Sequence, residues 1–218
     1  LADPQTTLMI LCNPHNPIGK LWDRETLARI GALCHRYGVT VISDEIHCDL
    51  TAPGREYVPF ASVSEECRQI SITCMAPTKA FNLAGIQTAA VSVPEPFLRH
   101  RVWRGLNTDE VAEPNAFAVT AAVAAFTQGA DWLDALRQYV EENRRTVDAF
   151  LRAHVPSVRL VPSEATYLLW LDCGAESGTD AGEIAAFLRR RTGLYLSAGA
   201  QYGGNGTGFL RMNIACPR

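Results

Sequence analysis

The chain has 218 residues, of which 47% are hydrophobic and 20% are charged, and its formal net charge is −3. This composition is typical of a globular protein with a substantial buried core. The small negative charge argues against nucleic acids and anionic membranes as partners. No apolar run approaches the roughly 18 residues of a transmembrane helix, so we expect no membrane partner.

Seven cysteines are present, an odd number without a CxxC pair. Several of them lie inside apolar runs, which indicates reduced and mostly buried thiols rather than a disulfide framework or a zinc site. We therefore expect a cytoplasmic protein without a metal site.

The beginning of the chain has the strand–helix–strand order of a parallel sheet. The apolar run Leu8–Cys12 predicts a strand that is buried on both faces. Asp23 can cap a following helix, and Gly38 can end it. The run Val39–Ser43 predicts the next buried strand, so we expect two parallel strands joined by a right-handed crossover.

Two more strands are predicted over Gln69–Thr73 and Gln87–Val93, with a polar loop between them. A long helix with apolar residues at helical spacing is predicted over about Asp131–Ala153. Short strands, a helix and a glycine-rich stretch after it indicate a separate α+β unit. We therefore divide the chain into one domain over residues 1–135 and a C-terminal domain over residues 136–218.

Three polar segments each follow a predicted buried strand. They contain Asn16, the pair Asp44 and His47, and the pair Thr78 and Lys79. Ligands of open α/β sheets bind at the carboxyl ends of strands, where loops from distant parts of the sequence converge. An amine, a carboxylate and an amide at such an edge are the groups that a pyridoxal-phosphate (PLP) site requires.

Arg211 follows the glycine-rich stretch and enters the predicted strand FLRMNIA, where its guanidinium could hold a substrate carboxylate. Taken alone, each of these residues has an ordinary structural interpretation. Lys79 could be a solvated lysine, Asp44 a helix cap and Arg211 a salt-bridge partner. Asn16 could form a turn, and His47 could be a partly buried histidine. Only their order and their common place at predicted strand ends favour a cofactor site.

Six ordered motifs resemble the class I/II aminotransferase family of fold-type I PLP enzymes, from about Leu8 to Arg218. The resemblance is strongest to its C–S lyase branch, the bacterial cystathionine β-lyases of the MalY and PatB type. DEIH together with NPHNP is the more discriminating pair, because many aminotransferases of the class have a tyrosine at the position of His47. The motifs are NPHNPIGKLW, SDEIHCDL, APTKAFNLAGIQ, RGLNTDEVAEPNAF, ATYLLWLD and GFLRMNIACPR.

The resemblance implies the three-layer α/β fold of aspartate aminotransferase, here a partial large PLP-binding domain followed by a small α+β domain. The family's chains are much longer, so we expect a fragment that lacks the N-terminal half and by itself binds PLP weakly and turns over poorly. We also expect the large sheet to expose an unpaired edge or an apolar face. The resemblance further implies a homodimer.

The resemblance assigns roles around the cofactor. It implies that Lys79 forms the Schiff base with PLP and moves the substrate Cα proton, and that Asp44 pairs with the pyridinium nitrogen. Asn16 then donates to the ring phenolate oxygen, with His47 near it in place of the tyrosine. Thr78 is assigned to the phosphate, although the family often has a serine three positions before the lysine, where this chain has an alanine.

The implied substrate is a small amino acid whose α-carboxylate is held by Arg211, with Tyr167 and Tyr202 lining the pocket. The implied reaction is an α,β-elimination that converts an S-substituted cysteine to a thiol, pyruvate and ammonia. Two alternatives remain open from the sequence. One is a PLP-dependent aminotransferase of the same fold, and the other is a non-catalytic domain that keeps the fold as a binding or regulatory module.

Overall fold

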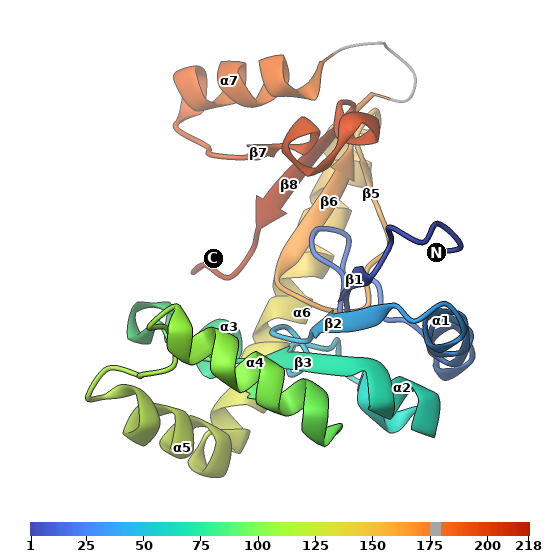
Figure 1. Cartoon of the computed structure of the whole chain (residues 1–218). Helices are drawn as coiled ribbons and strands as arrows, with labels where there is room; N and C mark the ends of the chain where they lie inside the picture. The colour runs from blue at the N-terminus through green and yellow to red at the C-terminus, as the bar shows by residue number, and fades with distance from the viewer. Residues whose placement is uncertain (175–179) are drawn as a thin grey trace. The chain divides into compact units, whose positions relative to one another are not determined.

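The computed structural model describes residues 1–174 and 180–218, and the chain divides into two compact units, each with its own sheet and core (Figure 1). The first unit comprises Leu1–Pro14 and Leu21–Ala135, and the second comprises His15–Lys20 and Leu136–Arg218. The short segment from His15 to Lys20 therefore groups with the second unit. The assignment of residues 1–135 and 136–218 to a large and a small domain stays a prediction.

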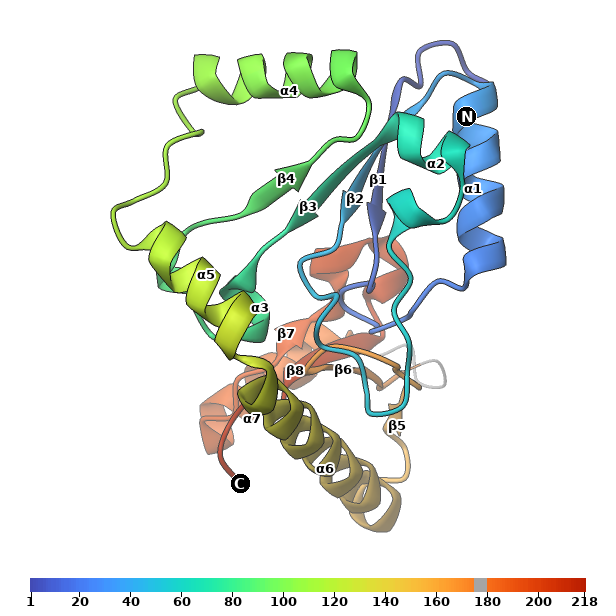
Figure 2. The same ribbon diagram turned by 90° about the horizontal axis from the view of Figure 1, so that it is seen from below.

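The first unit is built on a four-stranded sheet in the order β1-β2-β3-β4, with the first three strands parallel and β4 antiparallel (Figure 2). In register, Cys12 pairs with Asp44 and Asp44 with Cys74, so the carboxyl ends of the three parallel strands share one edge. The parallel pairing of the first two predicted strands is confirmed. The strands are β1 (Leu8–Cys12), β2 (Thr40–Asp44), β3 (Ser71–Met75) and β4 (Ala90–Ser92).

Helix α1 (Arg24–Arg36) begins and ends at the residues that the sequence predicts. The Asp23 carboxylate accepts a hydrogen bond from the Thr26 backbone N–H at 2.7 Å. After the last turn, Gly38 has φ +68° and its N–H donates to the His35 carbonyl, while the Val39 N–H donates to the Cys34 carbonyl. These paired bonds satisfy carbonyls that the helix leaves open, and the left-handed φ explains the glycine.

Three expectations for the middle of the chain are wrong in detail. The predicted strand over Gln69–Thr73 starts later, because Gln69 and Ile70 end helix α2. The predicted polar loop contains two short helices, and a proline in the first turn of one of them suits a helix start. The predicted strand over Gln87–Val93 is correspondingly shorter. The helices after α1 are α2 (Glu65–Ile70), α3 (Pro77–Ala80), α4 (Pro96–Thr108) and α5 (Ala118–Gln128), with 3₁₀ turns at Phe60–Ser62 and Ala84–Ile86.

Only one face of the first sheet is packed. Met9, Leu11 and Val41 belong to a core shared with helices α1 and α2, which lie together beside β1 and β2 (Figure 2). Ile10, on the opposite face of β1, is 71% exposed, and Leu8 is exposed as well. The prediction that β1 is buried on both faces is therefore wrong. The expected apolar face is present, and β1 is also an edge strand of the sheet.

The second unit is an antiparallel α+β arrangement, as the sequence predicts after the long helix. Its sheet has the order β5-β6-β8-β7 and packs Leu169, Leu171 and Leu210 against Val140 of helix α6. The elements are α6 (Ala130–His154), β5 (Arg159–Leu160), β6 (Leu168–Asp172), α7 (Ala181–Thr192), β7 (Ser197–Ala198), two 3₁₀ turns (Gly199–Tyr202 and Gly204–Gly206) and β8 (Phe209–Asn213).

None of the helices in the described ranges is long and apolar enough to cross a lipid bilayer. The described residues also contain no group of three or more histidine, cysteine, aspartate or glutamate side chains arranged to hold a metal ion. All seven cysteines lie in the described ranges and are free thiols.

Candidate active site

The carboxyl end of the first sheet carries two of the predicted residues on segments that belong to or follow neighbouring strands. Asp44 is the last residue of β2 and lies opposite Cys74 of β3, and the Glu45 N–H donates to the Cys74 carbonyl at 2.9 Å. Lys79 lies on α3, the helix that directly follows β3. The carboxylate and the amine therefore follow neighbouring parallel strands at the same edge. This edge is where an open α/β sheet binds its ligands.

Asp44 is half-buried and lies on the sheet face that carries Cys12 and Cys74. Burial raises the pKa of the Cys74 thiol, and the negative charges of Asp44 and Glu45 raise it further. The Asp44 carboxylate accepts from the Ile46 N–H at 3.3 Å, which forms a turn and not a helix start. The helix-cap interpretation of Asp44 is therefore wrong.

His47 lies in the turn after β2 and is 3% exposed. The Cys48 N–H donates to the Glu45 carbonyl, and the Leu50 N–H donates to the His47 carbonyl, so consecutive backbone bonds hold this turn. A buried histidine three residues after Asp44 agrees with the ordinary structural interpretation. The same position is also compatible with the role that the resemblance implies.

Two buried polar residues that sequence reasoning missed hold this edge in place. Glu45 is 2% exposed, and its carboxylate accepts from the Ser43 hydroxyl at 2.8 Å and the Phe60 N–H at 3.0 Å. Asn13 is fully buried, and its amide donates to the Val58 carbonyl at 3.1 Å. Both residues come directly after a strand, and this position was the signal in the sequence that could have identified them. Each is buried together with its hydrogen-bond partners, as buried polar groups in proteins generally are.

Thr78 and Lys79 are half-buried and line a pocket of about 760 Å³ in the first unit. The wall of this pocket includes Ala76 and residues of β4 and α4, such as Trp103. Neither the amine of Lys79 nor the carboxylate of Asp44 forms an ion pair with another residue of the described ranges. The two groups thus have their charges available to a ligand.

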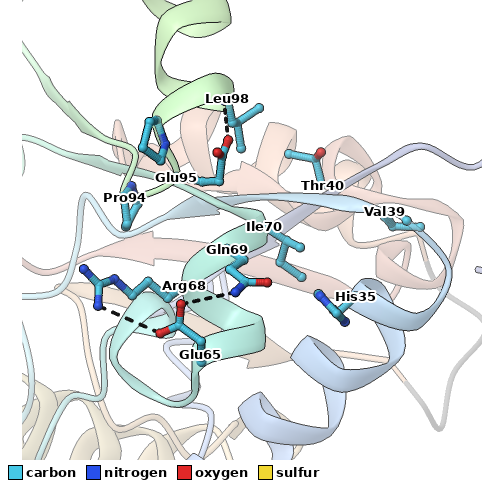
Figure 3. Close-up of a pocket in the computed structure, with 12 residues that line it drawn as sticks. His35, Val39, Thr40, Glu65, Arg68, Gln69, Ile70, Pro94, Glu95 and Leu98 are labelled. Carbon is cyan, nitrogen blue, oxygen red and sulfur yellow. Dashed lines mark hydrogen bonds and ion pairs between the residues drawn. The ribbon is translucent and has the colours of Figure 1, made fainter.

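A further pocket of about 840 Å³ lies at the other end of the strands, near the amino end of β2 (Figure 3). Its lining includes His35, Val39 and Thr40, and Glu65 bonds to both Arg68 and Gln69 within it. None of the predicted site residues lines this pocket. It therefore has no part in the candidate site.

The second unit forms a separate group of contacts around Arg211, which we call the arginine cluster: Asn16, Ser197, Tyr202 and Arg211. One guanidinium nitrogen of Arg211 donates to the Asn16 side-chain oxygen at 3.3 Å, and another donates to the Ser197 hydroxyl at 3.4 Å. The guanidinium carbon lies 4.9 Å from the centroid of the Tyr202 ring. Ser197 is a residue that the sequence did not single out.

The charge of Arg211 is met by neutral partners in the arginine cluster. Within the described residues it forms no ion pair with a carboxylate, so the salt-bridge interpretation of Arg211 is wrong. Tyr167 is close enough to sense this charge: burial raises the pKa of its hydroxyl, and Arg211 partly opposes the rise. A planar guanidinium held by neutral groups is suited to bind a carboxylate through two parallel hydrogen bonds.

The described residues thus form two sets. The first unit carries Asp44, His47, Thr78 and Lys79, and the second unit carries Asn16, Tyr167, Tyr202 and Arg211. Comparison with known proteins identifies the scaffold. The family model "Aminotransferase class I and II" matches residues 1–218. The chain belongs to the class I and II aminotransferase family.

Curated relatives of this aminotransferase-family chain include two bacterial proteins. Cystathionine beta-lyase PatB of Bacillus subtilis is 44% identical over 216 residues, which cover 99% of the chain and 56% of the relative. Protein MalY of Escherichia coli is 34% identical over 219 residues, which cover 100% of the chain and 55% of the relative. The chain therefore spans about half the length of these relatives.

Solved structures show the same fold. Cystalysin of Treponema denticola, whose crystal structure contains a pyridoxal 5'-phosphate cofactor, matches with a TM-score of 0.94 at 28% identity, over 99% of the chain and 54% of that structure. A PLP-bound putative aminotransferase from Clostridium difficile matches with a TM-score of 0.92 at 34% identity, over 97% of the chain and 54% of that structure. The expected α/β fold of PLP-dependent enzymes is confirmed for the part that the chain covers.

Proposed function

We propose that the chain supplies the catalytic lysine and the substrate-binding arginine of a PLP-dependent carbon–sulfur β-lyase. The reaction converts an S-substituted cysteine to a thiol, pyruvate and ammonia. One observation carries the proposal: Asp44 and Lys79 follow neighbouring parallel strands at one sheet edge, and neither is paired with another described charge.

The residues at this edge suit PLP. When bound, PLP supplies an aromatic ring that accepts the electron pair left at the substrate Cα. Asp44 would provide the negative charge that keeps the pyridine nitrogen protonated, and the amine of Lys79 would hold the cofactor. In the same unit, His47 is assigned to the ring oxygen and Thr78 to the phosphate. Asn16, which the resemblance also assigns to the ring oxygen, belongs to the second unit.

The chain's own groups account for substrate binding and proton movement. Arg211 binds the α-carboxylate of the amino acid through its planar fork, with Tyr167 and Tyr202 beside it. Once the substrate has taken its place on the cofactor, the free Lys79 amine would accept the proton from Cα, and the thiol would leave from Cβ with the electron pair of the C–S bond. A carboxylate held by two parallel hydrogen bonds fixes the orientation of the substrate on the Arg211 guanidinium.

Two observations favour a lyase over an aminotransferase. DEIH occurs together with NPHNP, and among the curated relatives the proteins named cystathionine β-lyases are 31% to 44% identical to the chain, whereas two named aminotransferases are 24% and 26% identical. A solved structure named a putative aminotransferase is 34% identical, so the comparison of identities carries less weight than the motif pair. The non-catalytic alternative is disfavoured because Asn16, Asp44, Lys79 and Arg211 are all present.

We also propose that the protein is a homodimer, since the first unit exposes apolar side chains on β1. We propose a cytoplasmic location, since the cysteines are free thiols.

The cofactor part of the proposal can be tested by borohydride trapping. The sequence contains two lysines, Lys20 and Lys79, so reduction in the presence of PLP should attach the cofactor at one identifiable position. We expect the label on the Lys79 peptide, loss of the label in Lys79→Arg, and an unchanged label in Lys20→Arg. A label on Lys20 or on the N-terminal amine, with none on Lys79, contradicts the proposal.

The reaction is tested by pyruvate release from cystathionine without an added keto acid. Because the chain spans 56% of the Bacillus subtilis relative, the assay uses the chain mixed with the part of that relative outside the match, here called the complemented chain. A lyase releases pyruvate in this mixture. An aminotransferase requires an added keto acid, and a binding module yields neither product although it retains the label on Lys79.

A further inference from the structure

Helix α6 carries two consecutive arginines that share one carboxylate but differ in what else they touch. Arg144 lies 3.4 Å from Glu141 and has an 11% exposed side chain, whereas Arg145 lies 3.1 Å from Glu141 and is 75% exposed. Only Arg144 extends to another segment. Its two terminal nitrogens donate to the Ser163 carbonyl at 2.9 Å and to the Thr166 carbonyl at 3.2 Å.

These two bonds clamp the backbone of the loop from Ser163 to Thr166, just before strand β6. A guanidinium suits this task, because its donors have a fixed geometry and can bind two carbonyls at once. Hydrogen bonds from a charged group are also stronger than neutral ones. The loop is therefore fixed to α6 at both ends by one buried side chain.

The clamped loop touches the turn from His15 to Lys20. The Glu164 N–H donates to the Gly19 carbonyl at 2.8 Å. Gly19 has φ +65°, and a Cβ built on it would lie 2.3 Å from both the Ala165 carbonyl oxygen and the Ser163 hydroxyl oxygen. Such a distance leaves no room for a methyl group, so the turn and the loop fit together only with glycine at this position.

The same turn carries Asn16, the partner of Arg211. The loop also leads directly into β6, which pairs with the strand of Arg211: Trp170 lies opposite Arg211 in the sheet. Arg144 is thus connected to the Asn16–Arg211 pair by two routes, through the Gly19 turn and through strand β6.

We propose that Arg144 is a positioning residue: it holds the Asn16–Arg211 pair in place, and thereby fixes the guanidinium with which Arg211 binds the substrate carboxylate. The expected effect on turnover rests on the proposed function. The positioning of Asn16 and Arg211 does not, because all three residues belong to the second unit. Arg144 contacts backbone carbonyls and Glu141 and not the reacting groups. Its effect is therefore transmitted through the loop, the turn and β6.

The test compares Arg144→Lys with Arg145→Lys. Both variants keep the positive charge beside Glu141, but a lysine ammonium lacks the planar fork that spans the two loop carbonyls. The first measurement is the side-chain NMR signals of Asn16 Nδ2–H and Arg211 Nε–H in the 218-residue chain without cofactor. We expect Arg144→Lys to shift both signals and Arg145→Lys to leave them in place. Unchanged signals in a folded Arg144→Lys chain overturn the inference.

Gly19→Ala changes the contact between the turn and the clamped loop from the side of the turn. This variant tests the inference if Arg144→Lys does not fold. The added methyl group pushes the turn away from the loop, so the Asn16 and Arg211 signals should shift without any change to Arg144. If Gly19→Ala folds and leaves both signals in place, the turn does not transmit the position of the loop and the inference fails.

The second measurement is the turnover of the complemented chain. We expect Arg144→Lys to raise KM about tenfold while kcat stays within about twofold, because lost positioning weakens carboxylate binding. A merely structural role would instead lower the active fraction, and hence kcat, with KM unchanged. If the unaltered chain releases no pyruvate, the proposed function fails and the NMR comparison alone decides the role of Arg144.

Discussion

Each unit of the chain contains a strand that ends in aspartate with the same local hydrogen bond, yet only one of the two lies at a candidate site. Asp44 ends β2 and accepts from the Ile46 N–H at 3.3 Å, and Asp172 ends β6 and accepts from the Gly174 N–H at 3.2 Å. Burial and the adjacent carboxylate raise the pKa of a neighbouring cysteine in both places.

The difference lies in the direction of the neighbouring strands. Beside Asp44 the parallel strands β1 and β3 also end, so their following segments converge on one edge. Beside Asp172 the antiparallel strands β5 and β8 begin, at Arg159 and Phe209. A polar residue at a strand end therefore contributes to a site when the neighbouring strands run in the same direction as its own.

The largest effect is expected from removing the charge at each strand end. Asp44→Asn should lower the turnover of the complemented chain about 1,000-fold, because a neutral amide no longer stabilises the charged pyridine ring. The matched variant Asp172→Asn keeps the same turn and should leave turnover within about twofold. Steady-state pyruvate release measures both variants. Equal losses of turnover would show that the direction of the neighbouring strands does not decide which aspartate serves the site.

The next largest effect concerns the two faces of β1. Leu11 is 4% exposed, so Leu11→Ala should lower the free energy of unfolding by about 3 kcal/mol. Ile10→Ala, one residue earlier on the exposed face, should change it by less than about 0.5 kcal/mol. Urea denaturation of the chain measures both. A large loss in Ile10→Ala would mean that the face bearing Asp44 is packed in solution.

A smaller effect is expected from the arginine cluster. Arg211→Ala should raise KM about 100-fold, since the substrate carboxylate loses two charge-assisted hydrogen bonds. Arg189→Ala is the matched control, because the guanidinium carbon of Arg189 also lies 4.9 Å from the centroid of a tyrosine ring, that of Tyr195. Neither of these two residues belongs to the arginine cluster. A KM that rises equally in both variants would assign the effect to lost cation–π packing.

The smallest effect is a pH dependence near Asp172. Burial, together with the charge of Asp172, raises the pKa of Cys173 to about 11. A raised thiol pKa contributes stability that is complete below the pKa of the unfolded chain and is lost as the pH rises through the folded value. Urea denaturation should therefore show a loss of roughly 1 kcal/mol between pH 9 and pH 11 that Cys173→Ala removes. The exposed Cys216 provides the control, and an unaltered pH slope in Cys173→Ala contradicts the assignment.

Elements with strong local signals could be predicted from the sequence. The apolar run of β1 and the capping residues Asp23 and Gly38 each specify their own backbone, so β1 and α1 lie where the pattern places them. The boundary at Gln69 was misplaced because a short helix joins β3 without a break in the apolar pattern. Lys79 was expected in a loop, since the four residues of α3 are too few for a helical period to be recognised.

The amino-acid sequence is enough to give the order of the polar segments, the strands they follow and the motifs that resemble the family. Three further facts come from the packing of the folded chain: Ile10 faces solvent, Glu45 is buried, and Asn16 contacts Arg211 although 195 residues separate them. The physical reason is that strand and helix patterns arise from neighbouring residues. Which surface is covered, and which distant side chains meet, depends instead on how separate elements pack.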